Sequence, residues 1–218
     1  MGARRRTDMN ISILGTGNMA SGLAVLFAKA GHAVTLGSRK PAEAETVARA
    51  LGRGIAGTGL ADTAGRSDLV VLAVPYSAVA DVLATTGDLT GKTVVDITNP
   101  MTADFSGLAI GLTTSAAEEI QKAVPAARVV KAFNTVFAQV LHADGKVAGR
   151  PATVFVAGDD AGARASVARL AADVGLDPLE VGGLASARYL EPVAGLNIAL
   201  GYGLGLGTDI APTWLRAA

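Results

Sequence analysis

Short apolar runs rich in Val and Ile alternate with Ala-rich stretches of helical character along most of the chain. Apolar runs of this kind are typical of strands that are buried on both faces of a parallel sheet. They predict strands near residues 10–14, 33–37, 68–74, 93–97, 128–132 and 153–157. The stretches between them predict helices near residues 18–30, 41–51, 76–84, 115–123 and 160–173. The pattern therefore indicates an α/β fold with a doubly wound, mostly parallel sheet.

The last quarter of the chain predicts a small α/β part that ends in a helix. A brief strand is expected near residues 177–181, and Leu184, Leu190, Val193 and Leu196 then keep one helical face apolar. Such a face suits docking or dimerisation. We therefore expect a disordered leader over residues 1–8, a nucleotide-binding domain over 9–150, and a C-terminal part over 151–218.

Composition narrows the classes of function. The chain of 218 residues is half apolar and carries 19 basic and 19 acidic residues, which gives no electrostatic reason to bind nucleic acid or an anionic membrane. It has no cysteine and two histidines, which excludes a thiolate zinc site and thiol catalysis. The most apolar late segment, 192–207, is shorter than the ~20 residues that span a bilayer. These features indicate a cytoplasmic protein whose partners are small molecules.

A glycine-rich turn, GTGNMA, follows the first predicted strand and opens the first predicted helix. It comprises Gly15, Thr16, Gly17, Asn18, Met19 and Ala20. In a strand-turn-helix unit, the first glycine permits the tight turn and the second lets the backbone approach a pyrophosphate at the helix N-terminus. The turn therefore predicts a Rossmann-like fold that binds a dinucleotide.

The end of the second predicted strand lacks the acidic residue that commonly binds the ribose 2′-hydroxyl of NAD. The chain has Gly37, Ser38, Arg39 and Lys40 at this point. A guanidinium can hold a 2′-phosphate in a bidentate, charge-assisted pair, whereas an acid would repel it. This exchange favours NADP over NAD.

Two later strand ends are expected at the same edge of the sheet, where ligands of open parallel sheets bind. One ends in Val74 and Pro75, and the other leads to Asn99. For Pro75, and for Pro100 directly after Asn99, termination of the strand explains the proline as well as cofactor contact does. The amide of Asn99 can hydrogen-bond a nicotinamide carboxamide or a ribose.

No side chain stands out as a catalytic acid or base. His32 is expected in a surface turn at the far end of the sheet, and His142 in a polar loop. Lys131 ends a strand, and the alternation of side chains is expected to aim it away from its neighbours. We therefore assign no catalytic residue.

Several stretches taken in order resemble the NADPH:F420 oxidoreductase family, which passes hydride between NADP and the deazaflavin coenzyme F420. The stretches are SILGTGNMASGLA, GSRK, VVLAVPY, VVKAFNTVFA, VAGDD and LEVGGLASARYLEPVAGLNIAL, which together run from Asn10 to about Gly207. The resemblance implies a Rossmann domain, a homodimer, and a deazaflavin lying against the nicotinamide. A hydride can pass directly between the two rings, which accounts for the missing proton relay.

The resemblance also implies residue roles. The cofactor turn of the family falls on Thr16 to Met19, and its 2′-phosphate pocket on Ser38, Arg39 and Lys40. The deazaflavin-facing segment of the family falls on residues 132–136, of which we take Asn134 and Val136 as contacts. A last contact in the Gly-rich tail falls on Leu204 or Leu206, of which we take Leu206. Archaeal members have histidine in place of Asn134 and proline in place of Phe137.

Other readings of the sequence remain open. An NADPH-dependent reductase could act on a flavin, a ferric complex, or a small imine or carbonyl. The large helical substrate domain of many imine and hydroxyacid enzymes does not fit in the roughly 60 residues that follow the strand at 153–157. A non-catalytic NADP sensor would need the glycine turn and the basic pocket alone.

Overall fold

The computed structural model describes residues 9–214. Its elements, in chain order, are β1 (Asn10–Leu14), α1 (Asn18–Lys29), β2 (Ala33–Ser38), α2 (Pro41–Leu51), β3 (Ala56–Gly59), α3 (Leu60–Gly65), β4 (Leu69–Leu72), the 3₁₀ turn η1 (Tyr76–Ala78), α4 (Val79–Thr86), β5 (Thr93–Asp96), α5 (Ala116–Ala123), β6 (Arg128–Lys131), α6 (Ala138–His142), β7 (Lys146–Val147), β8 (Arg150–Pro151), β9 (Thr153–Gly158), α7 (Ala161–Asp173), β10 (Asp177–Glu180), the 3₁₀ turn η2 (Leu184–Ser186), α8 (Ala187–Ile198) and the π-helical turn η3 (Ala199–Gly203).

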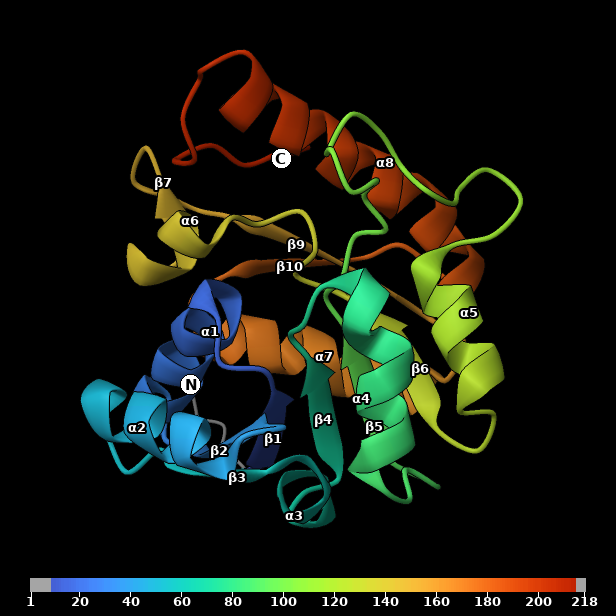
Figure 1. Cartoon of the computed structure of the whole chain (residues 1–218). Helices are drawn as coiled ribbons and strands as arrows, with labels where there is room; N and C mark the ends of the chain where they lie inside the picture. The colour runs from blue at the N-terminus through green and yellow to red at the C-terminus, as the bar shows by residue number, and fades with distance from the viewer. Residues whose placement is uncertain (1–8, 215–218) are drawn as a thin grey trace, which may run out of the picture.

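Eight strands form one sheet in the order β10-β9-β6-β5-β4-β1-β2-β3, and β7 pairs with β8 in a separate hairpin (Figure 1). All neighbours in the large sheet are parallel except β6 and β9, which run antiparallel. The chain leaves β1 for β2 on one side and later returns to β4 on the other. Ligands of such sheets bind at this switch point, outside the carboxyl ends of the strands.

Helices cover both faces of the sheet and bury alternate side chains of each strand. Ile11 and Ile13 of β1 belong to a core that includes residues of α1, α2, α6 and α7. Leu14 belongs to a second core on the other face, with residues of α3, α4 and α5. The predicted fold class, a Rossmann-like and mostly parallel α/β sheet with a C-terminal helix, is confirmed.

The predicted strands and main helices are all present, and their ends agree within a few residues. The sequence reasoning missed β3, whose four residues AGTG lack the branched side chains of the other strands. The reason for this composition is the closeness of α2, since a Cβ on Gly57 would lie 2.3 Å from the carbonyl of Ala44. Helices α3 and α6 and the β7–β8 hairpin were missed as well.

The predicted apolar face of the last helix is wrong in part. Leu184 precedes α8 in η2, and the buried face of α8 consists of Ala187, Leu190, Glu191, Ala194 and Asn197. Leu196 lies on the opposite side and is 61% exposed, because six residues after Leu190 turn the helix by about 240°.

The stretch from residue 151 continues the sheet and the core of the preceding part. β9 pairs with β6, and Val154 and Val156 belong to the same core as Ile11 and Ile13. The division near residue 150 remains a prediction, and the proposed leader over residues 1–8 lies outside the described residues. No helix within residues 9–214 combines the length and apolar character needed to cross a membrane.

Candidate cofactor site

The turn after β1 has the geometry that its glycines predict. Gly15 has a φ of +136°, and a Cβ there would lie 2.2 Å from the carbonyl oxygen of Ala73, so only glycine fits. Its N–H donates to the carbonyl of Gly37 at 2.8 Å, which fixes the turn against β2. Gly17 is the N-cap of α1, has no side chain to cap the first N–H groups, and has no atom within 4 Å of a Cβ position. The helix N-terminus is thus open to an anionic group.

A cleft of about 320 Å³ lies where this turn meets the ends of β2 and β4. Its lining contains eight of the predicted cofactor residues, and these are Gly15, Thr16, Gly17, Ser38, Arg39, Lys40, Val74 and Pro75. Asn18 and Met19 belong to the first turn of α1, beyond the lining residues. The remaining lining residues, Gly37, Glu43, Leu60, Ala73 and Val82, were not predicted.

The basic residues of the cleft are exposed and open to a ligand. Arg39 and Lys40 are both exposed, and neither forms an ion pair within residues 9–214. The hydroxyl of Ser38 accepts a hydrogen bond from the backbone N–H of Lys40 at 3.1 Å, which orders the turn between β2 and α2. This arrangement can receive a phosphate with two cations and a hydroxyl.

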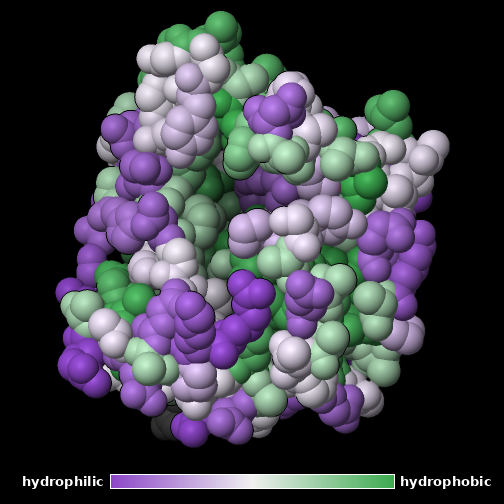
Figure 2. All heavy atoms as spheres, in the orientation of Figure 1, coloured by the Kyte–Doolittle hydropathy of each residue, from purple (hydrophilic) through white to green (hydrophobic). Residues whose placement is uncertain are grey.

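The same face of the molecule is hollowed between the carboxyl ends of β1 and β4 and the overlying helix α8. Figure 2 shows this hollow, which contains both hydrophobic and hydrophilic residues. Ligand pockets commonly combine apolar walls with a few polar groups that orient the ligand.

Asn99 and Asn134 face each other at the ends of β5 and β6. Asn99 Nδ2 donates to the backbone carbonyl of Asn134 at 2.8 Å, and Asn134 Nδ2 donates back to Asn99 Oδ1 at 3.0 Å and to the carbonyl of Leu190 at 3.1 Å. Phe133, just before, is buried and has a φ of +60°, which is rare for a bulky residue and turns the chain sharply. Both amide hydrogens of Asn134 are thus used in hydrogen bonds to Asn99 and Leu190.

Buried polar atoms without partners gather at these two strand ends. Asn134 Oδ1, Thr98 Oγ1 and Thr135 Oγ1 have no hydrogen-bond partner within residues 9–214. Of the predicted deazaflavin contacts, Asn134 and Val136 are buried, whereas Leu206 is 61% exposed on the C-terminal tail. The contact of these three residues with a second ring remains a prediction. The atom of Asn134 that has no partner in the described residues is Oδ1, which is a hydrogen-bond acceptor.

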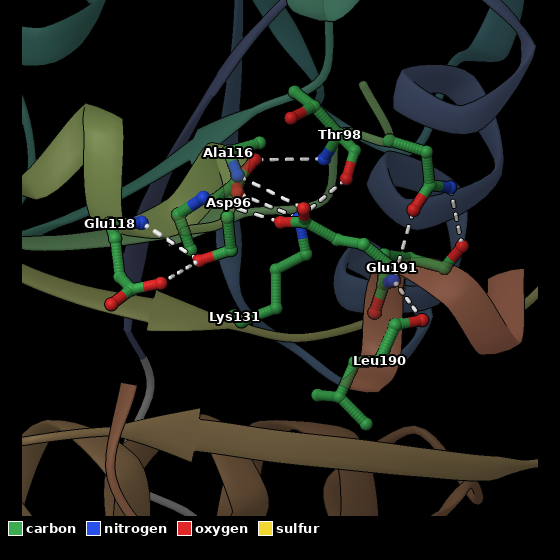
Figure 3. A network of polar contacts seen from close by, with 11 residues as sticks. Asp96, Thr98, Ala116, Glu118, Lys131, Leu190 and Glu191 are labelled. Carbon is green, nitrogen blue, oxygen red and sulfur yellow. Dashed lines mark hydrogen bonds and ion pairs between the residues drawn. The ribbon is translucent and has the colours of Figure 1, made fainter. Parts of the chain in front are cut away.

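A fully buried charge cluster lies beside the amide pair (Figure 3). Lys131 Nζ contacts Asp96 Oδ2 and Glu191 Oε1, each at 2.8 Å, and donates to the carbonyl of Thr98 at 2.6 Å. All three charged side chains are 0% exposed. The expectation that Lys131 points away from its neighbours is wrong, because Lys131 and Asp96 are paired in parallel register and such partners share a face of the sheet.

Glu191 joins this cluster to the N-terminus of α5. Its carboxylate accepts hydrogen bonds from the backbone N–H groups of Ala116 at 2.9 Å and Ala117 at 3.3 Å. Burial raises the pKa of Glu191, and the nearby Asp96 adds to the rise, while Lys131 and the Ala116 N–H oppose it. The cluster fastens α8 to β5, β6 and α5, and so fixes the roof of the hollow.

A second ion pair ties α8 to α5 nearer the surface. Arg188 binds the carboxylate of Glu118 through two nitrogens, at 2.6 and 2.9 Å, and this pairing lowers the pKa of Glu118. The Ser115 hydroxyl caps the same helix by accepting from the Glu118 N–H.

Neither histidine takes part in the site. His32 is 5% exposed rather than a surface residue, and its Nδ1 accepts a hydrogen bond from the Met9 N–H. His142 is exposed at the end of α6 rather than in a loop.

Comparisons with known proteins identify relatives of this chain. The profile of a family described as "NADP oxidoreductase coenzyme F420-dependent" matches residues 10–100. The F420-dependent NADP reductase of Methanothermobacter thermautotrophicus is 33% identical over 208 residues, which cover 88% of this chain and 89% of that protein. A crystal structure of a candidate F420-dependent NADP reductase from Arthrobacter sp. FB24 superposes with a TM-score of 0.86 at 33% identity and covers 95% of this chain and 100% of that one.

A metalloreductase is also related. Rat metalloreductase STEAP3 is 30% identical over 183 residues, which cover 84% of this chain and 36% of that protein. The chain thus corresponds to a minor part of that relative, whereas it matches the archaeal reductase over almost its whole length. The chain belongs to the F420-dependent NADP reductase family of oxidoreductases.

Proposed function

We propose that this protein transfers a hydride between NADP(H) and the deazaflavin coenzyme F420. The observation that carries the proposal is the cleft in which the glycine turn meets Ser38, Arg39 and Lys40. It combines an uncapped helix N-terminus for a pyrophosphate with two cations for a 2′-phosphate. The family membership supports F420 as the second coenzyme.

The residues present fit NADP. Gly15, Thr16 and Gly17, with Asn18 and Met19 of α1, would hold the pyrophosphate, and the Ser38–Lys40 turn would hold the 2′-phosphate. Val74 and Pro75 would line the nicotinamide half. Asn99 keeps one amide hydrogen beyond the one given to Asn134, and it can donate this hydrogen to the carboxamide or ribose.

The end of β6 would orient the second ring. Asn134 can offer its Oδ1 to a ring N–H, since both of its amide hydrogens are bound. Val136 and Leu206 would supply apolar contacts. When bound, the two coenzymes would supply direct hydride transfer between their rings, the electron pair moving with the hydride and the accompanying proton being exchanged with solvent. The protein then has to align the rings and exclude water, and no acid or base of the chain is required.

The test mixes the purified protein with NADPH and oxidised F420 and follows the absorbance of both coenzymes. We expect turnover with NADPH and much slower turnover with NADH. Absence of turnover with F420 in both directions, in protein that binds NADPH, would replace this proposal by another acceptor or by an NADP sensor.

The relation to STEAP3 favours a second candidate, the reduction of a flavin or a ferric complex by NADPH. Riboflavin, FMN, a ferric chelate and a cyclic imine, offered at the same concentration as F420, distinguish the candidates by their rates. Faster turnover with ordinary flavins would favour this second candidate.

We also propose a cytoplasmic homodimer. The C-terminal region exposes several large apolar side chains, and these are Tyr189, Leu196, Tyr202, Leu204 and Leu206. Apolar groups gathered in this way often mark an interface. Light scattering coupled to size exclusion would give the mass of the particle, and a monomer at micromolar concentration would contradict the dimer.

A further inference from the structure

Glu43 places a negative charge in the pocket where the chain would bind a 2′-phosphate. It lies in the first turn of α2, three residues after Lys40, and it lines the cleft together with Ser38, Arg39 and Lys40. It is the one carboxylate among the lining residues of that cleft. The turn after β2 has no acidic residue, but Glu43 of the following helix α2 places a carboxylate in the same pocket.

The carboxylate reaches across the mouth of the cleft. Glu43 Oε1 accepts a hydrogen bond from the Thr16 hydroxyl at 2.8 Å, which joins α2 to the glycine-rich turn 27 residues earlier. Thr16 is one of the residues that would meet the cofactor. The bond therefore occupies a hydroxyl that a phosphate oxygen could otherwise use.

The charges of the pocket are not neutralised internally. Glu43, Arg39 and Lys40 are all exposed, and no ion pair joins them to each other or to other side chains in the described part of the chain. A bound 2′-phosphate would meet two attractive charges and one repulsive charge. A ribose 2′-hydroxyl, in contrast, could donate a hydrogen bond to the carboxylate.

We propose that Glu43 is a specificity-determining residue that reduces the preference for NADP over NAD. Its carboxylate takes the hydrogen bond of Thr16 in the free protein and opposes the 2′-phosphate, and it accepts the 2′-hydroxyl of NAD. The inference rests on the cofactor half of the proposed function. It also implies that the preference set by Arg39 and Lys40 is smaller than these two cations alone would produce.

The experiment measures the dissociation constants of NADP⁺ and NAD⁺ by calorimetry for the wild type, Glu43→Gln and Glu45→Gln. Gln keeps the size and an acceptor for Thr16 while removing the charge. Glu45 is exposed on the same helix but does not line the cleft, so Glu45→Gln is the matched control. We expect Glu43→Gln to bind NADP⁺ about three- to tenfold more tightly, to bind NAD⁺ equally or more weakly, and to lose most of its gain in high salt.

An effect that is equal for both cofactors, or equal in Glu45→Gln, would overturn the inference. If Glu43 serves only to favour the helix N-terminus of α2, Glu43→Gln would lower the melting temperature and leave the ratio of the two constants unchanged. A wild-type protein that binds neither cofactor would overturn the proposed function as well. A wild-type protein that prefers NADP⁺ by the same ratio as Glu43→Gln would overturn this inference alone.

Discussion

The polar groups at the ends of β1 and β2 differ in kind from those at the ends of β5 and β6. At the first pair, Arg39, Lys40 and Glu43 are exposed and line an open cleft. At the second pair, Asp96 and Lys131 are fully buried and bound to each other. The charges of the first region form no ion pair in the described part of the chain, whereas those of the second region are paired within the protein.

The difference separates binding from positioning along one edge of the sheet. Exposed charges cost little to keep unpaired, because water solvates them, and they are free to pair with an incoming phosphate. Buried charges are costly unless each has a partner, so their geometry is rigid once the partners are in place. A ring that has to be aligned for hydride transfer benefits from rigid walls, and α8 is held by such contacts.

The largest effect is expected from Lys131→Met, which leaves Asp96 and Glu191 buried without their common cation. Removal of one partner of a buried ion cluster costs about 3–5 kcal/mol of unfolding free energy. Denaturant unfolding measures this loss. The control Lys122→Met removes an exposed lysine that pairs with Glu119, and it should leave the midpoint unchanged. Equal losses of unfolding free energy in the two variants would show that the buried cluster stabilises the fold no more than the exposed pair does.

Arg39→Glu is the corresponding change at the exposed end. It removes the charge-assisted pair that we propose between Arg39 and the 2′-phosphate, and it adds repulsion. The affinity for NADP⁺ should therefore fall roughly ten- to hundredfold, while the affinity for NAD⁺ and the thermal stability stay nearly constant. Calorimetric titration with both cofactors measures the change. Arg49→Glu, on the far end of α2, is the control. Equal loss for NADP⁺ and NAD⁺ would contradict the role of Arg39.

The sequence predicted the cofactor turn but not the buried charge cluster, and the reason is physical. The cofactor turn has a local signal, since Gly15, Gly17 and the absent acid occur at fixed spacings within one β-α-β unit. The buried cluster depends on the register between β5 and β6 and on Glu191, 60 residues after Lys131. The sequence did contain a signal for this cluster, because VVD and VVK end two neighbouring apolar strands with opposite charges. The alternation of side chains along the single strand β6, however, led to the prediction that Lys131 points away from its neighbours.

The same limit explains the other errors. β3 was missed because Gly57 permits the close approach of α2, although glycine has a low strand propensity. Glu43 was missed because it belongs to the next helix and not to the turn after β2. In each case the decisive neighbour comes from another element, which a local pattern does not contain.

Asn134→Ala tests whether the amide pair belongs to the rigid region or to the ligand-binding one. The change leaves Asn99 Oδ1 and the Leu190 carbonyl without their donor, and unsatisfied groups of this kind cost about 1–3 kcal/mol. We expect a loss of that size in unfolding free energy, a raised KM for the ring acceptor and an unchanged Kd for NADP⁺. Asn10→Ala, an exposed asparagine at the start of β1, is the control. Unchanged stability with a raised KM would assign Asn134 to ligand binding alone.

The smallest effect is a difference in pH dependence between the two carboxylates that bind α5 to α8. The pKa of Glu191 is raised in the folded protein, so its stabilising contribution is complete below pH 4.5, its ordinary pKa, and is lost as the pH rises through the folded value. Since Gln does not titrate, the stability of Glu191→Gln relative to wild type should increase across that window. The pKa of Glu118 is lowered by Arg188, so its contribution is present above pH 4.5 and is lost as the pH falls through the folded value. Glu118→Gln should therefore lose stability relative to wild type as the pH rises toward 4.5.

Unfolding curves of the wild type and the two variants, recorded between about pH 3 and 8, measure both trends. This range includes the ordinary pKa of a carboxyl group and the raised values that burial produces. Parallel curves for the two variants would remove the distinction between the fully buried carboxylate of Glu191 and the partly buried carboxylate of Glu118.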